Sequence, residues 1–153
     1  MATENQISIE IPQEIIDNIT TKLQECRNDL APYLQALTGE DRMGLLKMGD
    51  KSLSTVQKVK SYIQTNPEFV PAYMEKEEFL KDEAVVTQLT PIANLAEQLF
   101  SDVDDTRLLA GSEALKASLL YYGQIREADN KGVTSAKPIY EDLKQRFSKR
   151  RKS

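Results

Sequence analysis

Apolar side chains return every three or four residues along the N-terminal part of the chain. They are Ile16, Ile19, Leu23, Cys26, Leu30, Tyr33 and Leu37. A mean period of about 3.5 residues is typical of an α-helix packed lengthwise against other helices. Pro12 suits the first turn of such a helix, where a backbone N–H has no intrahelical partner. Pro32 lies inside the pattern, and because the spacing continues through it we predict one helix with a kink at Pro32.

The same spacing continues through the rest of the chain. It predicts long helices over about 76–103 and 105–128, and short ones over 52–64 and 135–147. Pro91 predicts a second kink. The alternating segment 7–11 is short, so we expect an extended lead-in there and not a strand. The fold prediction is therefore all-α, an antiparallel bundle of three long and two short helices.

Loop signals separate these helices. Thr38 is expected to begin a one-turn helix. The segment 66–71, NPEFVP, is expected to form a tight corner held by Phe69, since proline disfavours helix at the preceding residue. Gly132 is free to take the left-handed conformation that commonly ends a helix. These signals divide the chain without requiring any strand.

A chain of 153 residues fits one domain. We expect an extended lead-in over 1–10, a single helical-bundle domain over 11–147 and a disordered basic tail over 148–153. No apolar run approaches the roughly 18 residues needed to cross a bilayer, and the N-terminus has no secretory pattern. The single cysteine, Cys26, is expected to be a small buried apolar residue in a reducing compartment. These features predict a cytoplasmic protein.

The chain contains no histidine. Histidine is the commonest general base and the commonest transition-metal ligand, so zinc sites and Ser-His-Asp triads are excluded in their usual forms. Carboxylates or lysines could still catalyse a reaction, but their spacing does not indicate one. We therefore expect no metal, no cofactor and no enzymatic activity.

The segment GLLKMGDKS, 44–52, is close to a phosphate-binding loop, G-x-x-x-x-G-K-[ST]. Gly44 and Gly49 have the required separation, but Asp50 is inserted before Lys51 and would place negative charge beside a phosphate. We interpret the segment as a loop-to-helix junction in which Gly49 takes positive φ and Asp50 caps the next helix. The alternative is a weak anion site at Lys51 and Ser52, at the helix N-terminus.

Two clusters within the predicted long helices have competing interpretations. Small residues occur at Ala110, Gly111, Ser112 and Ala114. Because glycine inside a helix costs about 1 kcal/mol relative to alanine, we expect a neighbouring helix to approach closely there, with a ligand cleft as the alternative. Acidic residues occur at Asp102, Asp104, Asp105 and Glu113. Helix capping explains these acids more simply than a cation site.

The net charge of −4 conceals a basic C-terminus. The candidates for nucleic-acid contact are Lys149, Arg150, Arg151 and Lys152. They have no aromatic residues among them, and the remainder of the chain is acidic, which is poorly suited to nucleic acid. The simpler interpretation is a solvated terminus that complements the C-terminal end of the last helix.

Four blocks together resemble a known group of proteins. They are KMGDKS (47–52), NPEFVP (66–71), DDTRLLAGSEAL (104–115) and IYEDLKQRF (139–147). Similar blocks occur in the same order in a group of short, uncharacterised, all-helical bacterial proteins. The resemblance extends from about residue 30 to 147 and implies a bacterial cytoplasmic protein with one compact domain. It implies no activity, ligand or catalytic residue.

The leading functional hypothesis is a non-enzymatic helical module that binds another protein or a second copy of itself. Its basis is the width of the apolar stripes, which could leave a face for a partner helix. Two alternatives stay open: weak nucleic-acid association through the basic tail, and small-molecule binding in a cleft near Gly111. No membrane partner is expected.

Overall fold

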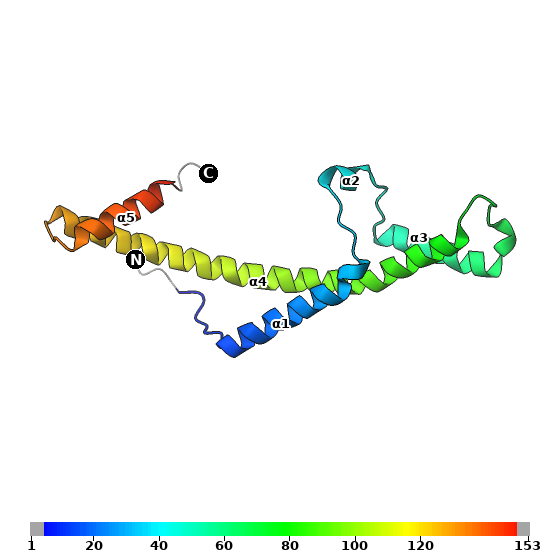
Figure 1. Cartoon of the computed structure of the whole chain (residues 1–153), viewed down its shortest axis with the longest axis horizontal. Helices are drawn as coiled ribbons and strands as arrows, with labels where there is room; N and C mark the ends of the chain where they lie inside the picture. Colours follow the sequence, from blue (N-terminus) through cyan, green and yellow to red (C-terminus); the bar gives the residue numbers. More distant parts are fainter. Residues whose placement is uncertain (1–4, 150–153) are drawn as a thin grey trace. The chain divides into compact units, whose positions relative to one another are not determined.

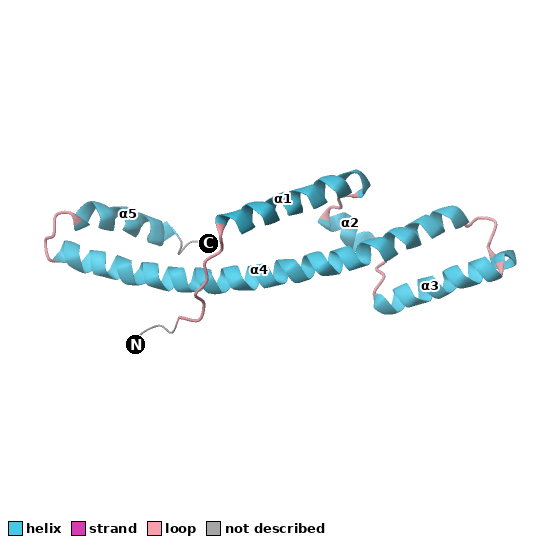
Figure 2. Cartoon of the chain, turned by 90° about the horizontal axis from the view of Figure 1, so that it is seen from below, coloured by secondary structure: helices cyan, strands magenta, loops and turns pink. Residues whose placement is uncertain are grey.

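The computed structural model describes residues 5–149 of the chain (Figure 1). Its α-helices are α1 (Gln13–Leu30), α2 (Gly39–Gly44), α3 (Asp50–Thr65), α4 (Lys76–Asn130) and α5 (Ala136–Lys149). Short 3₁₀ helices cover Ala31–Tyr33 and Pro67–Phe69. Among the residues described there is no strand, as the view coloured by secondary structure also shows (Figure 2). The all-α prediction is confirmed, and residues 7–11 have no regular secondary structure.

The chain divides into two units, and the boundary lies within α4. The first unit is Glu10–Glu97, with α1, α2, α3 and the beginning of α4. The second contains the remainder of α4 and α5, together with the segment that precedes residue 10. That 11–147 form a single domain stays a prediction.

In the first unit, α3 and the beginning of α4 lie side by side as a helical hairpin (Figures 1 and 2). The inner face of α3 carries the half-buried Leu53 and Val56 and the buried Ile63, which retains 7% exposure. Across the hairpin, Lys60 Nζ donates to Glu83 Oε2 at 2.6 Å. Glu83 Oε1 also accepts from the Thr87 hydroxyl at 2.9 Å. Apolar packing and one satisfied ion pair therefore hold the two helices together.

In the second unit, α5 packs along the C-terminal end of α4 (Figures 1 and 2). Ala136, at the first turn of α5, retains only 4% exposure. The Tyr122 ring of α4 lies 5.8 Å from the Tyr140 ring and 4.9 Å from the Phe147 ring, measured between centroids. Aromatic rings at these separations attract each other in addition to burying apolar area. This cluster fixes α5 against α4.

The turn between α4 and α5 follows from Gly132. Its φ of +80° is the only positive φ among the described residues. The Val133 N–H donates to the Ala128 carbonyl and the Gly132 N–H donates to the Asp129 carbonyl, each at 3.0 Å. This pair of bonds is the Schellman motif, which satisfies the last carbonyls of a helix. The predicted left-handed glycine is confirmed.

Gly132→Ala is expected to lower the free energy of unfolding by about 1 kcal/mol, because a Cβ disfavours the left-handed conformation. An added Cβ would meet no heavy atom within 4 Å, so the cost is a backbone effect. Gly123→Ala is the matched control. Gly123 lies inside α4 with equally open surroundings, and there alanine should stabilise the helix by about 0.5–1 kcal/mol. Urea unfolding of both variants measures the two effects, and equal effects would contradict the explanation.

The predicted break between residues 103 and 105 is wrong, because α4 is one helix of 55 residues. The acids expected to cap a new helix instead support the existing one. Asp104 pairs with Arg107 one turn later, and Gln98 Nε2 donates to Asp102 Oδ1 at 2.9 Å. Acids that suit a helix start are also partners for residues three or four positions away within a helix. The helix also continues through Pro91, and a kink there stays a prediction.

The predicted continuation of the first helix through Pro32 is wrong. The α-helix ends at Leu30, and Leu34 is already extended, with ψ of 142°. Proline has no N–H to donate to the preceding turn, and here the chain tightens into a 3₁₀ turn in place of a kinked α-helix. Tyr33 and Leu37 therefore do not extend the apolar face of α1.

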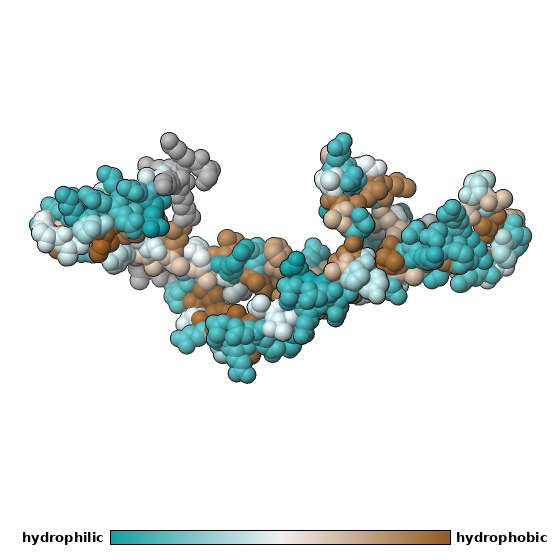
Figure 3. Space-filling view, in the orientation of Figure 1, coloured by the Kyte–Doolittle hydropathy of each residue, from teal (hydrophilic) through white to brown (hydrophobic). Residues whose placement is uncertain are grey.

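Few apolar side chains are enclosed in either unit. Among the described residues, Ile63 and Ala136 are the buried apolar ones. The space-filling view shows apolar residues at the surface over much of the chain (Figure 3). Cys26, predicted to be buried, is exposed on α1. A helix pair covers one stripe of each helix, whereas a bundle covers a wider arc, so pairing alone leaves apolar area in contact with water.

Candidate functional site

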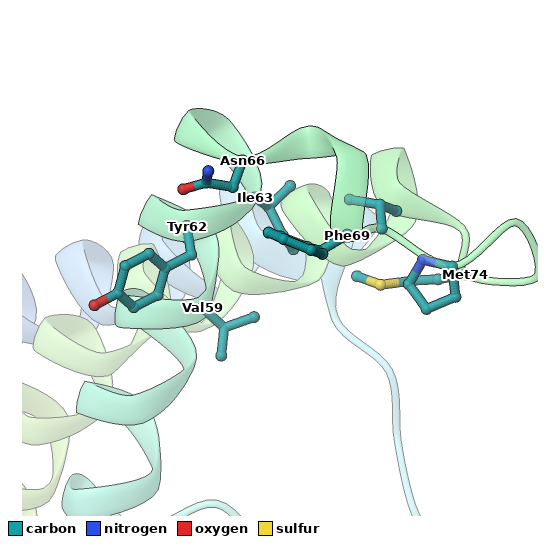
Figure 4. Close-up of a pocket in the computed structure, with 8 residues that line it drawn as sticks. Val59, Tyr62, Ile63, Asn66, Phe69 and Met74 are labelled. Atoms are coloured by element: carbon teal, nitrogen blue, oxygen red, sulfur yellow. The ribbon is translucent and has the colours of Figure 1, made fainter.

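An apolar groove of about 570 Å³ lies where α3 ends and the chain turns toward α4 (Figure 4). We call it the α3 groove. Its lining residues are Val59, Tyr62, Ile63, Asn66, Phe69, Val70, Pro71 and Met74. They belong to the last turns of α3, to the 3₁₀ helix and to the loop before α4. The volume lies within the range of about 300–1,000 Å³ typical of ligand pockets.

The corner that shapes this groove is held by backbone hydrogen bonds. The Asn66 N–H donates to the Tyr62 carbonyl at 2.7 Å, which closes α3. Pro67 then begins the 3₁₀ helix, and the Val70 N–H donates to the Pro67 carbonyl at 3.1 Å. Two successive turns thus place side chains from three segments around one space. The tight corner predicted from NPEFVP is present.

Phe69 does not hold this corner in the way the sequence suggested. Its side chain retains 79% exposure and forms part of the groove wall in place of a buried anchor. An exposed phenylalanine ring at a corner is apolar surface in contact with water, which a ligand or partner could cover. The segment NPEFVP contains no signal for this outward direction, since a residue at a corner lies on neither face of a helix.

Polar groups occur at the edge of the groove. The Asn66 side chain donates from Nδ2 to Glu68 Oε1 at 3.0 Å. This hydrogen bond, followed by one from the Glu68 backbone, holds the pKa of the Glu68 carboxyl below its usual value. Lys58 Nζ lies 5.3 Å from the centroid of the Tyr62 ring, within the range of a cation–π contact. The lining residues include no carboxylate, lysine or thiol, and most of them are apolar.

The wall of the groove is braced by the Lys60–Glu83 ion pair, one turn before Ile63. Glu83 retains 5% exposure. Its pKa is held below the ordinary value of 4.5, first by the hydrogen bond from Lys60 and then by that from Thr87. Both acceptor oxygens are occupied, which is the condition under which a carboxylate can stay charged among apolar side chains.

A second hollow, of about 510 Å³, lies in the second unit beside the aromatic cluster. Its lining residues are Leu115, Leu119, Tyr122, Arg126, Lys144, Phe147 and Ser148. Burial, followed by the neighbouring Tyr140, raises the pKa of the Tyr122 hydroxyl. Tyr122 therefore stays neutral and contributes its ring to packing.

The small-residue cluster of α4 lies on exposed helix surface. Ala110, Gly111, Ser112 and Ala114 are all exposed. A Cβ added at Gly111 would meet no heavy atom within 4 Å, so the expected close approach of a helix is not seen among the described residues. Gly111 and Ser112 do line a hollow of about 670 Å³, but its lining residues all come from one stretch of α4. A ligand cleft there stays a prediction.

The GLLKMGDKS segment is a loop-to-helix junction. Gly49 is the N-cap of α3 with a φ of −89°, so the expected positive φ is wrong, and Asp50 lies in the first turn without acting as the cap. Lys51 and Ser52 are exposed in that first turn. The one-turn helix expected at Thr38 is confirmed, with a reciprocal capping box to Asp41.

Of the basic residues considered for nucleic acid, Lys149 is the last residue of α5. Arg150, Arg151 and Lys152 lie outside the described residues. Within residues 5–149, no group of three or more Cys, Asp or Glu residues is arranged to hold a metal ion. None of the described helices is both long and apolar enough to cross a membrane.

No family model matches the chain, and neither do any curated protein or any solved structure.

Proposed function

We propose that this chain is a non-enzymatic helical interaction module, which works by packing against other helices and against copies of itself. The observation that carries the proposal is the exposure of the apolar face of α1. Ile16, Ile19 and Leu23 retain 41%, 44% and 46% exposure. These residues are spaced as in helices that pack lengthwise, so another helix could cover them together.

The energetic argument supports association. Fully burying an exposed leucine or isoleucine side chain contributes about 1.5–3 kcal/mol of favourable free energy. Covering a row of such side chains with another helix would therefore favour association strongly. The middle of α4 adds Leu95, Leu99 and Leu108, all exposed. We propose that the antiparallel bundle predicted from the sequence is completed in this way, by helices of different chains.

Ile19→Lys combined with Leu23→Lys is expected to weaken self-association, because each change places a charge on the apolar face of α1. The matched control is Thr21→Lys with Asn28→Lys. It adds the same charge to the opposite face of the same helix, where both residues are exposed. Sedimentation over a concentration series should show the mass of the native chain and of the control rising with concentration.

The first variant should stay closer to the monomer mass at every concentration. A native chain that sediments as a strict monomer at high concentration would contradict self-association. Equal behaviour of the two lysine variants would instead show that the α1 face takes no part in it.

A further inference from the structure

We infer that two copies of this chain associate through antiparallel α3 helices, with the 43–48 loop of each copy seated in the α3 groove of the other. The inference rests on the self-association proposed above, and it names a second surface, its occupant and the relative direction of the two chains. In each copy, an exposed apolar loop precedes α3 and an open apolar groove lies at its other end. The proposed dimer pairs the loop of one copy with the groove of the other.

The 43–48 loop consists of the last two residues of α2 and the start of the linker to α3, and it is rich in exposed apolar side chains. Its exposed apolar residues are Met43, Leu45, Leu46 and Met48. Leu46 is fully exposed. Lys47 Nζ donates to the Arg42 carbonyl at 2.8 Å, which ties the loop back onto α2. The loop therefore offers several exposed apolar side chains to a partner.

The loop cannot fill the α3 groove of its own chain. Leu46 precedes Asp50 by four residues, and four extended residues span at most about 14 Å. Tyr62, one of the residues that line the groove, lies twelve residues into α3, or about 18 Å along the helix axis. The far wall, at Met74, is a further turn of chain away. The 43–48 loop therefore does not span the groove of its own chain from end to end, whereas the loop of a second copy approaches the groove from outside.

The exposed face of α3 has the shape that an antiparallel copy requires. Its residues are Ser52, Thr55, Val59, Tyr62 and Asn66, and all of them are exposed. The spacing of three, four, three and four puts them on one stripe, with small side chains at the N-terminal end and large ones at the C-terminal end. A two-fold axis at Val59 places Thr55 of one copy opposite Tyr62 of the second copy. At each end of the α3 pair, a small side chain of one helix therefore faces a large side chain of the other.

The same axis brings each loop to the opposite groove. In an antiparallel pair, the residues just before α3 of one copy face those just after α3 of the other. The 43–48 loop precedes α3, and the groove wall from Phe69 to Met74 follows it. Because a two-fold interface repeats each contact, both loops and both grooves are used at once and the assembly closes as a dimer.

Charge complementarity favours the same arrangement. The segment 42–51 is basic, with Arg42, Lys47 and Lys51 against Asp50. The segment 68–78 is acidic, with Glu68, Glu75, Glu77 and Glu78 against Lys76. An antiparallel pair brings opposite charges together at both ends, whereas a parallel pair would place like segments side by side. A second copy therefore fits this groove both in apolar shape and in the charge around it.

The test is disulfide trapping of the full chain in a Cys26→Ser background. Val59→Cys places a thiol on the proposed axis, and mild oxidation is expected to yield a covalent dimer in most of the chains. Gln57→Cys is the matched control. It is exposed on another face of α3 and should yield at least about tenfold less dimer at the same concentration.

Leu46→Asp supplies a second measurement, independent of any cysteine. Since Leu46 touches little else in its own chain, the change should leave helix content unaltered and weaken dimerisation by about tenfold, the effect typical of losing a central interface residue. If both cysteine variants trap equally, or Leu46→Asp dimerises normally while the chain still self-associates, the α3 interface is wrong and the proposed function stands. If the chain is monomeric, both the α3 interface and the proposed self-association are wrong.

Discussion

Lys60→Met is expected to lower the melting temperature of the first unit more than any other single change of a charged residue. It removes the donor that lies 2.6 Å from Glu83 Oε2 and leaves a buried carboxylate with only the Thr87 hydroxyl as partner. Breaking a buried ion pair by removing one member is far more costly than replacing both members. Thermal unfolding at neutral pH, followed by circular dichroism, measures the loss.

The control for this change is Lys81→Met. Lys81 pairs with Glu78 at 2.7 Å on the same helix, but both side chains are exposed. Exposed pairs contribute about 0–1 kcal/mol, so the melting temperature should hardly change. A comparable fall in both variants would mean that the burial of Glu83 does not determine the effect.

The same pair gives the expected pH dependence. In the native chain the pKa of Glu83 is held below its ordinary value of 4.5. Its contribution to stability is therefore present above that value and is lost as the pH falls through the lowered pKa. In Lys60→Met, Glu83 is still buried but has no ammonium partner, and this raises its pKa. Protonation of Glu83 then removes the free-energy cost of a buried, unpaired carboxylate charge. The difference in stability between the native chain and this variant should shrink as the pH is lowered from 7 to 4.

Phe147→Ala is expected to release α5 from α4. Phe147 provides the ring nearest to Tyr122, with centroids 4.9 Å apart, and it is half-buried between the two helices. Truncating a buried phenylalanine costs about 3–5 kcal/mol, and a half-buried one should lose about 2 kcal/mol. Because α5 has only 14 residues, it should not stay helical once it is released.

Hydrogen exchange of the α5 amides measures this release directly. Phe100→Ala is the control, since Phe100 lies in the same unit but is exposed on α4. That variant should leave exchange in α5 unchanged. Continued protection of the α5 amides in Phe147→Ala would show that the aromatic cluster does not hold the helix.

The sequence was informative wherever the determining interactions are local. The helix predicted over 52–64 is observed as Asp50–Thr65, and the one predicted over 135–147 as Ala136–Lys149. The one-turn helix that begins after Thr38 and the left-handed Gly132 were also predicted correctly. Caps and turns depend on side chains within about four residues, so their signals are complete in a short segment of sequence.

The errors arose where one residue type serves two purposes. Asp104 could begin a helix or pair within one, and only the following backbone distinguishes the two. Pro32 could kink a helix or end it, and the apolar spacing beyond it favoured the wrong choice. Spacing identifies the apolar face of a helix without identifying what covers it. Ile16 and Ile63 follow the same pattern, yet Ile16 is exposed and Ile63 is buried.

The α3 groove could be predicted only in part. The corner at NPEFVP follows from its two prolines, but the outward direction of Phe69 does not, because a corner residue has no helical face to fix it. The groove also requires Val59 and Tyr62 from the exposed stripe of α3. That stripe is polar at one end and apolar at the other, so its spacing does not mark it as an apolar face.

Each helix pair is built from segments that follow one another directly in the sequence. α3 and the beginning of α4 are joined by residues 66–75, and α4 and α5 by residues 131–135. Loops of about ten residues close in roughly 10–100 ns, and chains dominated by such local contacts fold in microseconds to milliseconds. Either pair can therefore form soon after its own residues leave the ribosome, without waiting for distant parts of the chain. If the proposed association takes place, it therefore begins from preformed helices, and little conformational entropy is lost in ordering them.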